Sequence, residues 1–243
     1  MKKVIGVYRN QNMHWVGDGF PVRNLFSYDR LGQAISPFLL LDYAAPYPFT
    51  PTKEQHGVGS HPHRGFETVT IAYQGEVTHQ DSSGGGGTIK AGDVQWMTAG
   101  GGVLHQEFHS PEFAHQGGLF EMVQLWVNLP AHSKMTPAKY QAIEAAQIQS
   151  ISLDDVGSEL RVIAGQYQER VGAATTFSPV NVWDGKVVAG QAHTFYVTEG
   201  HTTLLVVLSG EVILNDAQHI EAPSLVVLSR EEIDFTIKAE QDS

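Results

Sequence analysis

The chain has 243 residues, of which 42% are hydrophobic and 17% are charged, a composition typical of globular proteins. This length allows one large domain or two small ones. The formal net charge of −11 argues against non-specific binding to nucleic acid or to an anionic membrane, because both need a basic surface. The sequence contains no cysteine, which excludes disulfides and thiolate metal sites.

No segment reaches the roughly eighteen consecutive apolar residues that are needed to span a bilayer. The first residues, Met1–Tyr8, turn polar too early for a signal peptide. We therefore expect a cytoplasmic protein without a membrane-spanning segment.

Strands dominate the first half of the chain, where polar and apolar residues alternate and glycines mark the turns. We expect them at Phe66–Tyr73, Glu76–Gln80, Thr88–Lys90, Asp93–Met97, Val103–His109 and Glu121–Leu129. The segment Thr136–Ile148, with Pro137 and several alanines and glutamines, is expected to be a connection with some helix. Many short strands between regularly spaced turns predict an all-β sandwich or small barrel.

Strand patterns resume in the second half, where they resemble those of the first. We expect strands at Leu160–Ala164, Thr175–Val182, His193–Val197, Thr203–Leu208, Glu211–Leu214, Leu225–Leu228 and Ile233–Ile237. The segments Ile71–Val77 and Val206–Val212 both run from a buried strand through Gly-Glu-Val. Aligned on these segments and on a second, slightly shorter offset, the halves place Tyr196, Thr198, Thr202, Thr236 and Lys238 opposite His61, His63, Glu67, His105 and Glu107.

Two short motifs carry the candidate chemistry of the chain. His61 and His63 are two residues apart, as are His105 and Glu107, and residues i and i+2 of a strand point to the same face. Two neighbouring strands would then supply three imidazoles and a carboxylate, a ligand set suited to iron, nickel, manganese or copper. In an octahedral site these four ligands leave two positions open for chemistry.

The carboxylate has a second candidate in Glu67, which has the same strand parity as His61 and His63. Whichever of Glu67 and Glu107 does not bind the ion is expected to contact a ligand or to act as the general base. The remaining histidines of this region are expected to lie behind the ligands or on the surface. They are His56, His79, His109 and His115.

The segments His61–Thr70, Gly75–Ser82 and Ala91–Gly100, followed by His105-Gln106-Glu107, resemble the pirin family of the cupin superfamily. The resemblance implies two jelly-roll (cupin) β-barrels in tandem: residues 1–135 would form a metal-binding cupin domain, and residues 136–243 a cupin-like domain without metal ligands. It implies that His61, His63, His105 and Glu107 bind the metal, with Glu67 left as a residue behind the ligands or a catalytic carboxylate.

The resemblance also implies one divalent transition metal, with iron(II) as the first choice and nickel, manganese, cobalt, copper and zinc as alternatives. Several pirins resemble quercetin dioxygenases, so we expect a flavonol-like aromatic substrate and dioxygen, with ring opening and release of carbon monoxide. Glu107 or Glu67 would accept the substrate's hydroxyl proton. The alternative is an iron-dependent co-regulator that binds a protein partner without turnover. A third hypothesis, a cupin isomerase for sugars or keto acids, is disfavoured by the aromatic-rich strands.

Overall fold

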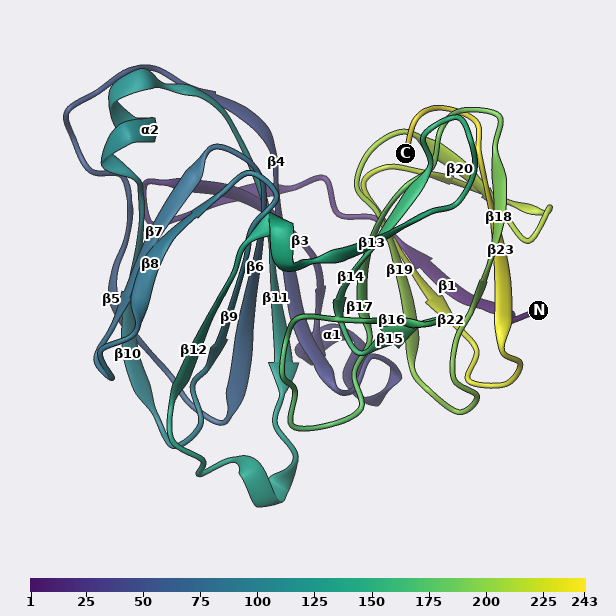
Figure 1. Cartoon of the computed structure of the whole chain (residues 1–243), viewed down its shortest axis with the longest axis horizontal. Helices are drawn as coiled ribbons and strands as arrows, with labels where there is room; N and C mark the ends of the chain where they lie inside the picture. The colour runs from purple at the N-terminus through teal and green to yellow at the C-terminus, as the bar shows by residue number, and fades with distance from the viewer. The chain divides into compact units, whose positions relative to one another are not determined.

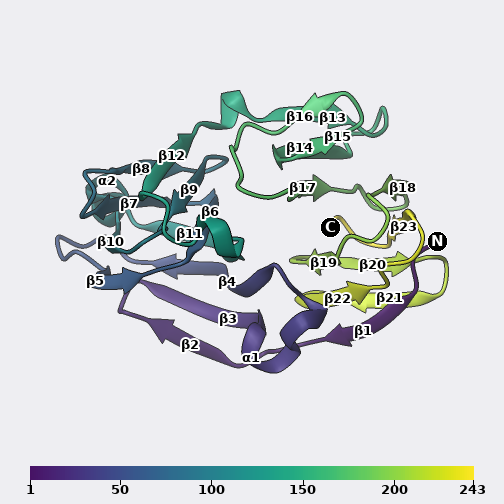
Figure 2. The ribbon, with the colours of Figure 1, turned by 90° about the horizontal axis from the view of Figure 1, so that it is seen from below.

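The computed structural model describes all residues from Met1 to Ser243 and consists mainly of β-strands. The chain forms two compact units. The N-terminal unit contains Asn12–Asn24 and Phe38–Gln147, and the C-terminal unit contains Met1–Gln11, Leu25–Pro37 and Ile148–Ser243. The two ends of the chain thus belong to the same unit, as Figure 2 shows.

The N-terminal unit is built on two sheets that face each other (Figure 1). The seven-stranded sheet has the order β12-β9-β6-β11-β4-β3-β2, and the four-stranded sheet has the order β5-β10-β7-β8. In chain order the strands are β2 (Met13–Val16), β3 (Phe20–Ser27), β4 (Phe38–Phe49), β5 (Gly57–His63), β6 (Phe66–Gln74), β7 (Glu76–Asp81), β8 (Gly86–Lys90), β9 (Val94–Thr98), β10 (Val103–His109), β11 (Gly118–Asn128) and β12 (Lys139–Ile143).

One helix of this unit shows clearly how the local sequence sets its ends. Helix α2 (Pro111–Gln116) begins after Ser110, whose side chain accepts a hydrogen bond from the Phe113 amide, and Pro111 suits the first helical position. It ends at Gly117, whose positive φ of 66° favours glycine. The unit also contains the 3-10 helices η2 (Ala131–Ser133) and η3 (Ala145–Gln147).

The C-terminal unit repeats this strand arrangement. Its four-stranded sheet, β18-β23-β20-β21, has the same order as β5-β10-β7-β8, and β1-β22-β19 forms a second sheet. The strands are β1 (Val4–Tyr8), β13 (Gln149–Ser152), β14 (Glu159–Ala164), β15 (Gln166–Tyr167), β16 (Arg170–Val171), β17 (Val182–Lys186), β18 (Ala192–Tyr196), β19 (Thr203–Val207), β20 (Glu211–Leu214), β21 (Gln218–Glu221), β22 (Ser224–Leu228) and β23 (Asp234–Ala239), and the helices are α1 (Tyr28–Leu31) and η1 (Gly32–Ala34).

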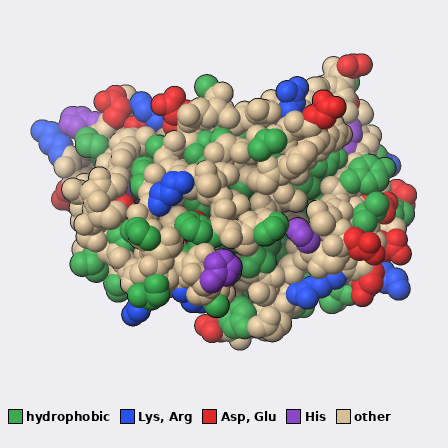
Figure 3. Space-filling model, turned by 60° about the horizontal axis from the view of Figure 1, so that its bottom comes forward, with side chains coloured by type: hydrophobic (Ala, Val, Ile, Leu, Met, Phe, Trp, Pro, Cys, Tyr) green, Lys and Arg blue, Asp and Glu red, His purple; other side chains and the backbone are tan.

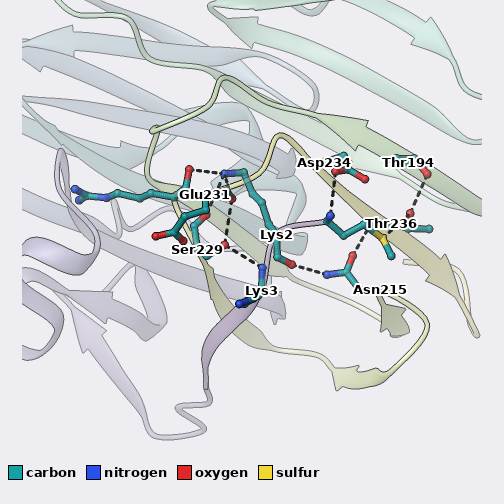
Figure 4. Close-up of polar contacts among 10 residues, drawn as sticks. Lys2, Lys3, Thr194, Asn215, Ser229, Glu231, Asp234 and Thr236 are labelled. Atoms are coloured by element: carbon teal, nitrogen blue, oxygen red, sulfur yellow. Dashed lines mark hydrogen bonds and ion pairs between the residues drawn. The ribbon is translucent and has the colours of Figure 1, made fainter.

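The N-terminal strand β1 joins the C-terminal unit through β22, with which it pairs antiparallel. Just before β1, the fully buried Lys2 directs its ammonium group to the carbonyl oxygens of Ser229, Arg230 and Glu231, at 3.0, 3.4 and 3.4 Å (Figure 4). The backbone oxygen of Lys2 accepts a hydrogen bond from Asn215. These contacts explain why the first residues belong to the second unit, whereas the domain boundary between residues 135 and 136 stays a prediction.

The strands predicted in the first half are confirmed, with ends shifted by at most three residues. The connection Thr136–Ile148 contains the expected helical part only as the single turn η3, and it also holds strand β12, which pairs with β9. One other expectation is wrong. The strand expected at Thr175–Val182 is irregular up to its last residue, where β17 begins.

The surface agrees with the acidic composition of the chain. Lys and Arg side chains are scattered singly over the face shown in Figure 3. None of the helices has the length and apolar character needed to cross a membrane.

Candidate metal centre

The predicted ligands lie on two paired strands of the four-stranded sheet. His61 and His63 are on β5 and His105 and Glu107 on β10, and His105 stands directly opposite His61. The register shifts between His105 and Glu107, a β-bulge with one extra residue on β5, so that Glu107 pairs with Val58. On the other edge of β10, His79 of β7 stands opposite Glu107.

The three imidazoles converge on one point. The ring centroids of His61 and His63 are 4.7 Å apart, those of His61 and His105 are 4.4 Å apart, and those of His63 and His105 are 4.8 Å apart. One nitrogen from each ring lies within 4.8 Å of the others. This is close enough for one ion between them, because metal–nitrogen bonds of about 2.0–2.1 Å place ligand atoms within roughly 4 Å of each other.

The protonation of these rings suits metal binding. Nδ1 of His61 lies 2.9 Å from the carbonyl oxygen of Gly59, and since a carbonyl only accepts, Nδ1 must donate and Nε2 keeps its lone pair. Burial, with some repulsion from neighbouring histidines, lowers the pKa of His63 to about 4. Burial likewise lowers the pKa of His105 to about 4, against the attraction of Glu107. At neutral pH the rings of His63 and His105 are therefore uncharged, as metal ligands must be.

The buried nitrogens also lack protein partners. Nε2 of His63 and both ring nitrogens of His105 have no hydrogen-bond partner in the protein. A buried polar atom without a partner is unfavourable, and such atoms need a specific explanation. A transition metal ion among the three rings would take the lone pair of one nitrogen from each ring, so the residues fit such an ion.

Glu107 is 3% exposed and is held from two sides. Its Oε1 lies 3.1 Å from Nδ1 of His79, and Nε2 of Gln124 donates to its two oxygens at 3.1 and 3.2 Å. Burial alone would raise the pKa of Glu107, but His79, His105 and Gln124 outweigh it and hold this pKa at about 2. The carboxylate is therefore ionised at neutral pH.

Glu107 belongs to a second cluster of ligand atoms, which contains His79, His105 and Glu107 within 4.8 Å of one another. The predicted ligands thus fall in two overlapping clusters that share His105. The second cluster also contains His79, which was not among the predicted ligands. His79 was expected either behind the ligands or on the surface, and because it is only 2% exposed, it does not lie on the surface.

Glu67 is not part of either cluster. Glu67 pairs with Thr98 of β9 and Val127 of β11, whereas Thr70 pairs with Gln124, the residue that contacts Glu107. Residues 67 and 70 of one strand point to opposite faces, so Glu67 lies on the sheet face away from Gln124. The Glu67 carboxylate instead accepts a hydrogen bond of 2.7 Å from Thr98. The expectation that it points toward His61 and His63 is wrong, because β5 ends at His63 and β6, in another sheet, begins at Phe66.

The other histidines lie apart from the clusters. Nδ1 of His56 contacts Asp18 at 2.9 Å, and His115 is exposed on α2. His109 is buried, and its Nε2 donates to the Gly19 carbonyl at 2.9 Å. Its ring is surrounded by four phenylalanine rings, those of Phe20, Phe49, Phe113 and Phe120.

A third cluster of metal-binding residue types, Glu211, His219 and Glu240, lies in the C-terminal unit. Nδ1 of His219 is 3.4 Å from Glu211 and 3.5 Å from Glu240, and the His219 side chain is 60% exposed. This is an exposed contact between a histidine and two acidic side chains, an arrangement common on protein surfaces without an ion.

Two aromatic side chains and a glutamine that the sequence did not single out border the centre. Phe66 stacks on Trp126, with centroids 4.5 Å apart, and Trp126 meets the His63 ring edge-on at 5.3 Å. Gln124 and Trp126 follow each other at i and i+2 on β11, so they share a sheet face. A polar residue between the buried Val123 and Leu125 of this strand was the signal available in the sequence.

The site and fold can now be compared with known proteins. A family model described as Pirin matches residues 19–127. A Pseudomonas aeruginosa protein named "putative quercetin 2,3-dioxygenase" is 54% identical over 242 residues, covering 100% of this chain and 84% of that protein. A solved structure of quercetin 2,3-dioxygenase from Acinetobacter baumannii has a TM-score of 0.98 and 74% identity, covering 100% of this chain and 84% of its own.

A more distant structure, an Escherichia coli pirin called YhhW in complex with nickel(II), has a TM-score of 0.72 at 18% identity, covering 98% of this chain and 95% of that one. At this identity the likeness concerns the fold, which is the all-β bicupin fold expected from the sequence. The matching model, the close relatives and the shared fold agree with the motifs around His61 and His105. The chain therefore belongs to the pirin family.

Proposed function

We propose that the protein is a metal-dependent dioxygenase of the quercetin 2,3-dioxygenase type, which opens the ring of a flavonol-like substrate and releases carbon monoxide. Residues 1–135 would carry this activity, and residues 136–243 would contribute no metal ligand. The observation that supports the proposal most is the convergence of three imidazoles, two of them with unpartnered buried nitrogens, beside an ionised carboxylate. The names of the close relatives point to the same reaction.

In this proposal His61, His63, His105 and Glu107 hold a divalent ion, with iron(II) as the first choice. When bound, the ion supplies Lewis acidity toward the substrate hydroxyl and a route for electron exchange with dioxygen. His61 presents Nε2 because Gly59 fixes its tautomer, and His63 and His105 stay neutral because they are buried. Glu107, ionised and pointing at His105, is the carboxylate in place to accept the hydroxyl proton.

The aromatic pair beside the ligands supports a flat substrate. Phe66 and Trp126 are half-buried, stack on each other and border His63, so an aromatic ring system arriving at the ion would meet an apolar wall. Sugars and keto acids would find few hydrogen-bonding groups on this wall. Both oxygen atoms of dioxygen enter the depside, and the carbon monoxide leaves as the ring carbon that carried the substrate's hydroxyl group, together with that hydroxyl oxygen.

The test is oxygen-dependent loss of quercetin absorbance, with carbon monoxide detected, by protein loaded separately with iron, nickel, manganese, cobalt, copper or zinc. His61→Ala and Glu107→Gln should abolish turnover with the active metal. Gln106→Leu is a matched control, because Gln106 neighbours Glu107 but bonds to Gln80 on the solvent side. One equivalent of bound metal without turnover would refute the dioxygenase and favour a metal-dependent binding protein.

A further inference from the structure

The side chain of Gln124 lies between the carboxylate of Glu107 and the indole of Trp126. Its Nε2 donates to both carboxylate oxygens, at 3.1 and 3.2 Å, and its Oε1 accepts from Trp126 Nε1 at 3.1 Å. All three groups come from strands in the two facing sheets, Glu107 from β10 and the other two from β11. The amide therefore bridges the two sheets at the centre.

The orientation of this amide is fixed by the chemistry of its neighbours. An indole N–H can only donate, so it must face the amide oxygen. An ionised carboxylate can only accept, so it must face the amide nitrogen. A flipped amide would lose the bonds on both sides, and Gln124 therefore has one stable orientation.

Trp126 is itself held in place. Its ring stacks on Phe66 with an interplanar angle of 29° and meets His63 at 77°. Strand β11 lies inside the sheet, paired with β4 on one side and β6 on the other. Gln124 is thus presented by a rigid strand, and its amide is oriented by a ring that also borders one of the imidazoles.

We infer that Gln124, oriented by Trp126, is a positioning residue for Glu107. Together with His79 on the opposite side, it holds both carboxylate oxygens, so the carboxylate has a single direction from which it can reach the ion. This inference rests on the proposed role of Glu107 as a ligand. Removing a partner that orients a ligand typically weakens metal affinity by about 10–100-fold.

The experiment measures cobalt(II) affinity, by competition with a chromophoric chelator, and the visible absorption spectrum of the bound cobalt in the full-length protein. The variants are Gln124→Leu, Trp126→Phe and Glu107→Gln, with Gln106→Leu as the matched control. Gln124→Leu should bind cobalt about 10–100-fold more weakly and show an altered spectrum, which a purely structural role would not produce. Trp126→Phe, which keeps an aromatic ring but removes the N–H, should shift both readouts in the same direction by less.

The outcomes separate the two proposals. If Glu107→Gln binds cobalt like the wild type, the ligand assignment is wrong and the positioning role fails with it. If Glu107→Gln loses affinity but Gln124→Leu matches Gln106→Leu in affinity and spectrum, only the positioning role is refuted. Should Gln124→Leu fail to fold, Trp126→Phe decides: an unchanged affinity and spectrum would overturn the inference.

Discussion

Replacing His105 by leucine should make the metal-free protein more stable and at the same time abolish metal binding. His105 is 2% exposed, neutral because its pKa is about 4, and without a partner at either ring nitrogen. A buried polar group without a partner costs about 1–3 kcal/mol. Leucine fills a similar volume and has no polar atoms. The variant should therefore be more stable than the metal-free wild type.

The expected gain in the metal-free state is about 1–3 kcal/mol, the cost of one buried polar group without a partner. For a protein of this size it corresponds to a rise in Tm of roughly 2–4 °C per kcal/mol. Bound metal should make the wild type the more stable of the two proteins. A ligand at about 100 times its Kd stabilises the native state by about 2.7 kcal/mol, and the variant, which cannot bind the metal, should gain none of this.

The assay is urea and thermal unfolding of both proteins, first with chelator and then with excess nickel or cobalt. His56→Leu is a control, since His56 has a partner in Asp18: it should lose up to about 1 kcal/mol and keep the metal-induced shift. If His105→Leu is clearly less stable than the wild type in chelator, the ring nitrogens have partners and the reasoning fails. An equal metal-induced shift in both proteins would remove His105 from the ligands.

Three further predictions concern residues outside the ligand set. Burial lowers the pKa of His109 from 6.5 to about 4, so between these pH values the unfolded chain binds more protons and the stability of the fold falls as the pH drops. His109→Phe should reduce this loss of stability by up to about 3 kcal/mol, measured by urea unfolding at pH 7 and pH 4. Lys2→Met should destabilise the protein by about 2 kcal/mol in thermal unfolding, because three carbonyls lose a charged donor, while metal affinity measured by chelator competition stays unchanged. Glu67→Gln should also leave metal affinity unchanged, and a loss would contradict its placement on the other sheet face.

The sequence predicted the strands around the ligands well because those strands alternate clearly or are fully apolar. The parity argument held within β5 and within β10, where His61, His63 and His105 converge as expected. It failed for Glu67 because strand parity is lost where the chain leaves one sheet for another. Gly65, with φ of 77°, turns the chain between the sheets, and nothing in local periodicity reports that two strands belong to different sheets.

The roles of His79 and Gln124 were hidden for a related reason. His79 reaches Glu107 through the pairing of β7 with β10, and Gln124 reaches it from the facing sheet. Such contacts depend on register and on the packing of sheets, which a single sequence does not specify. The strands of the first sixty residues were missed because β-propensity depends strongly on context.

The predicted likeness of the two halves is seen in the common order of their four-stranded sheets, but the predicted residue matches are one position off. In the N-terminal unit His61 pairs with His105 and His79 with Glu107. The corresponding pairs of β18, β23 and β20 are Phe195 with Phe235 and Leu214 with Ile237. The expected counterparts Tyr196, Thr236 and Lys238 are the strand neighbours of these residues and point to the opposite face.

This shift changes the meaning of the second half. The exposed Tyr196 is 60% accessible and says nothing about the interior, whereas Phe195 and Phe235 stack in the core with centroids 5.6 Å apart. A stacked phenylalanine pair thus occupies the position that two imidazoles hold in the first half. Phenylalanine rings have no polar atoms that need a hydrogen-bond partner, so at this position the C-terminal unit gains apolar packing. The N-terminal unit keeps buried ring nitrogens without partners there. The same sheet order therefore supports a stable core in one unit and, in the other, a site whose metal-free state is kept at some expense in stability.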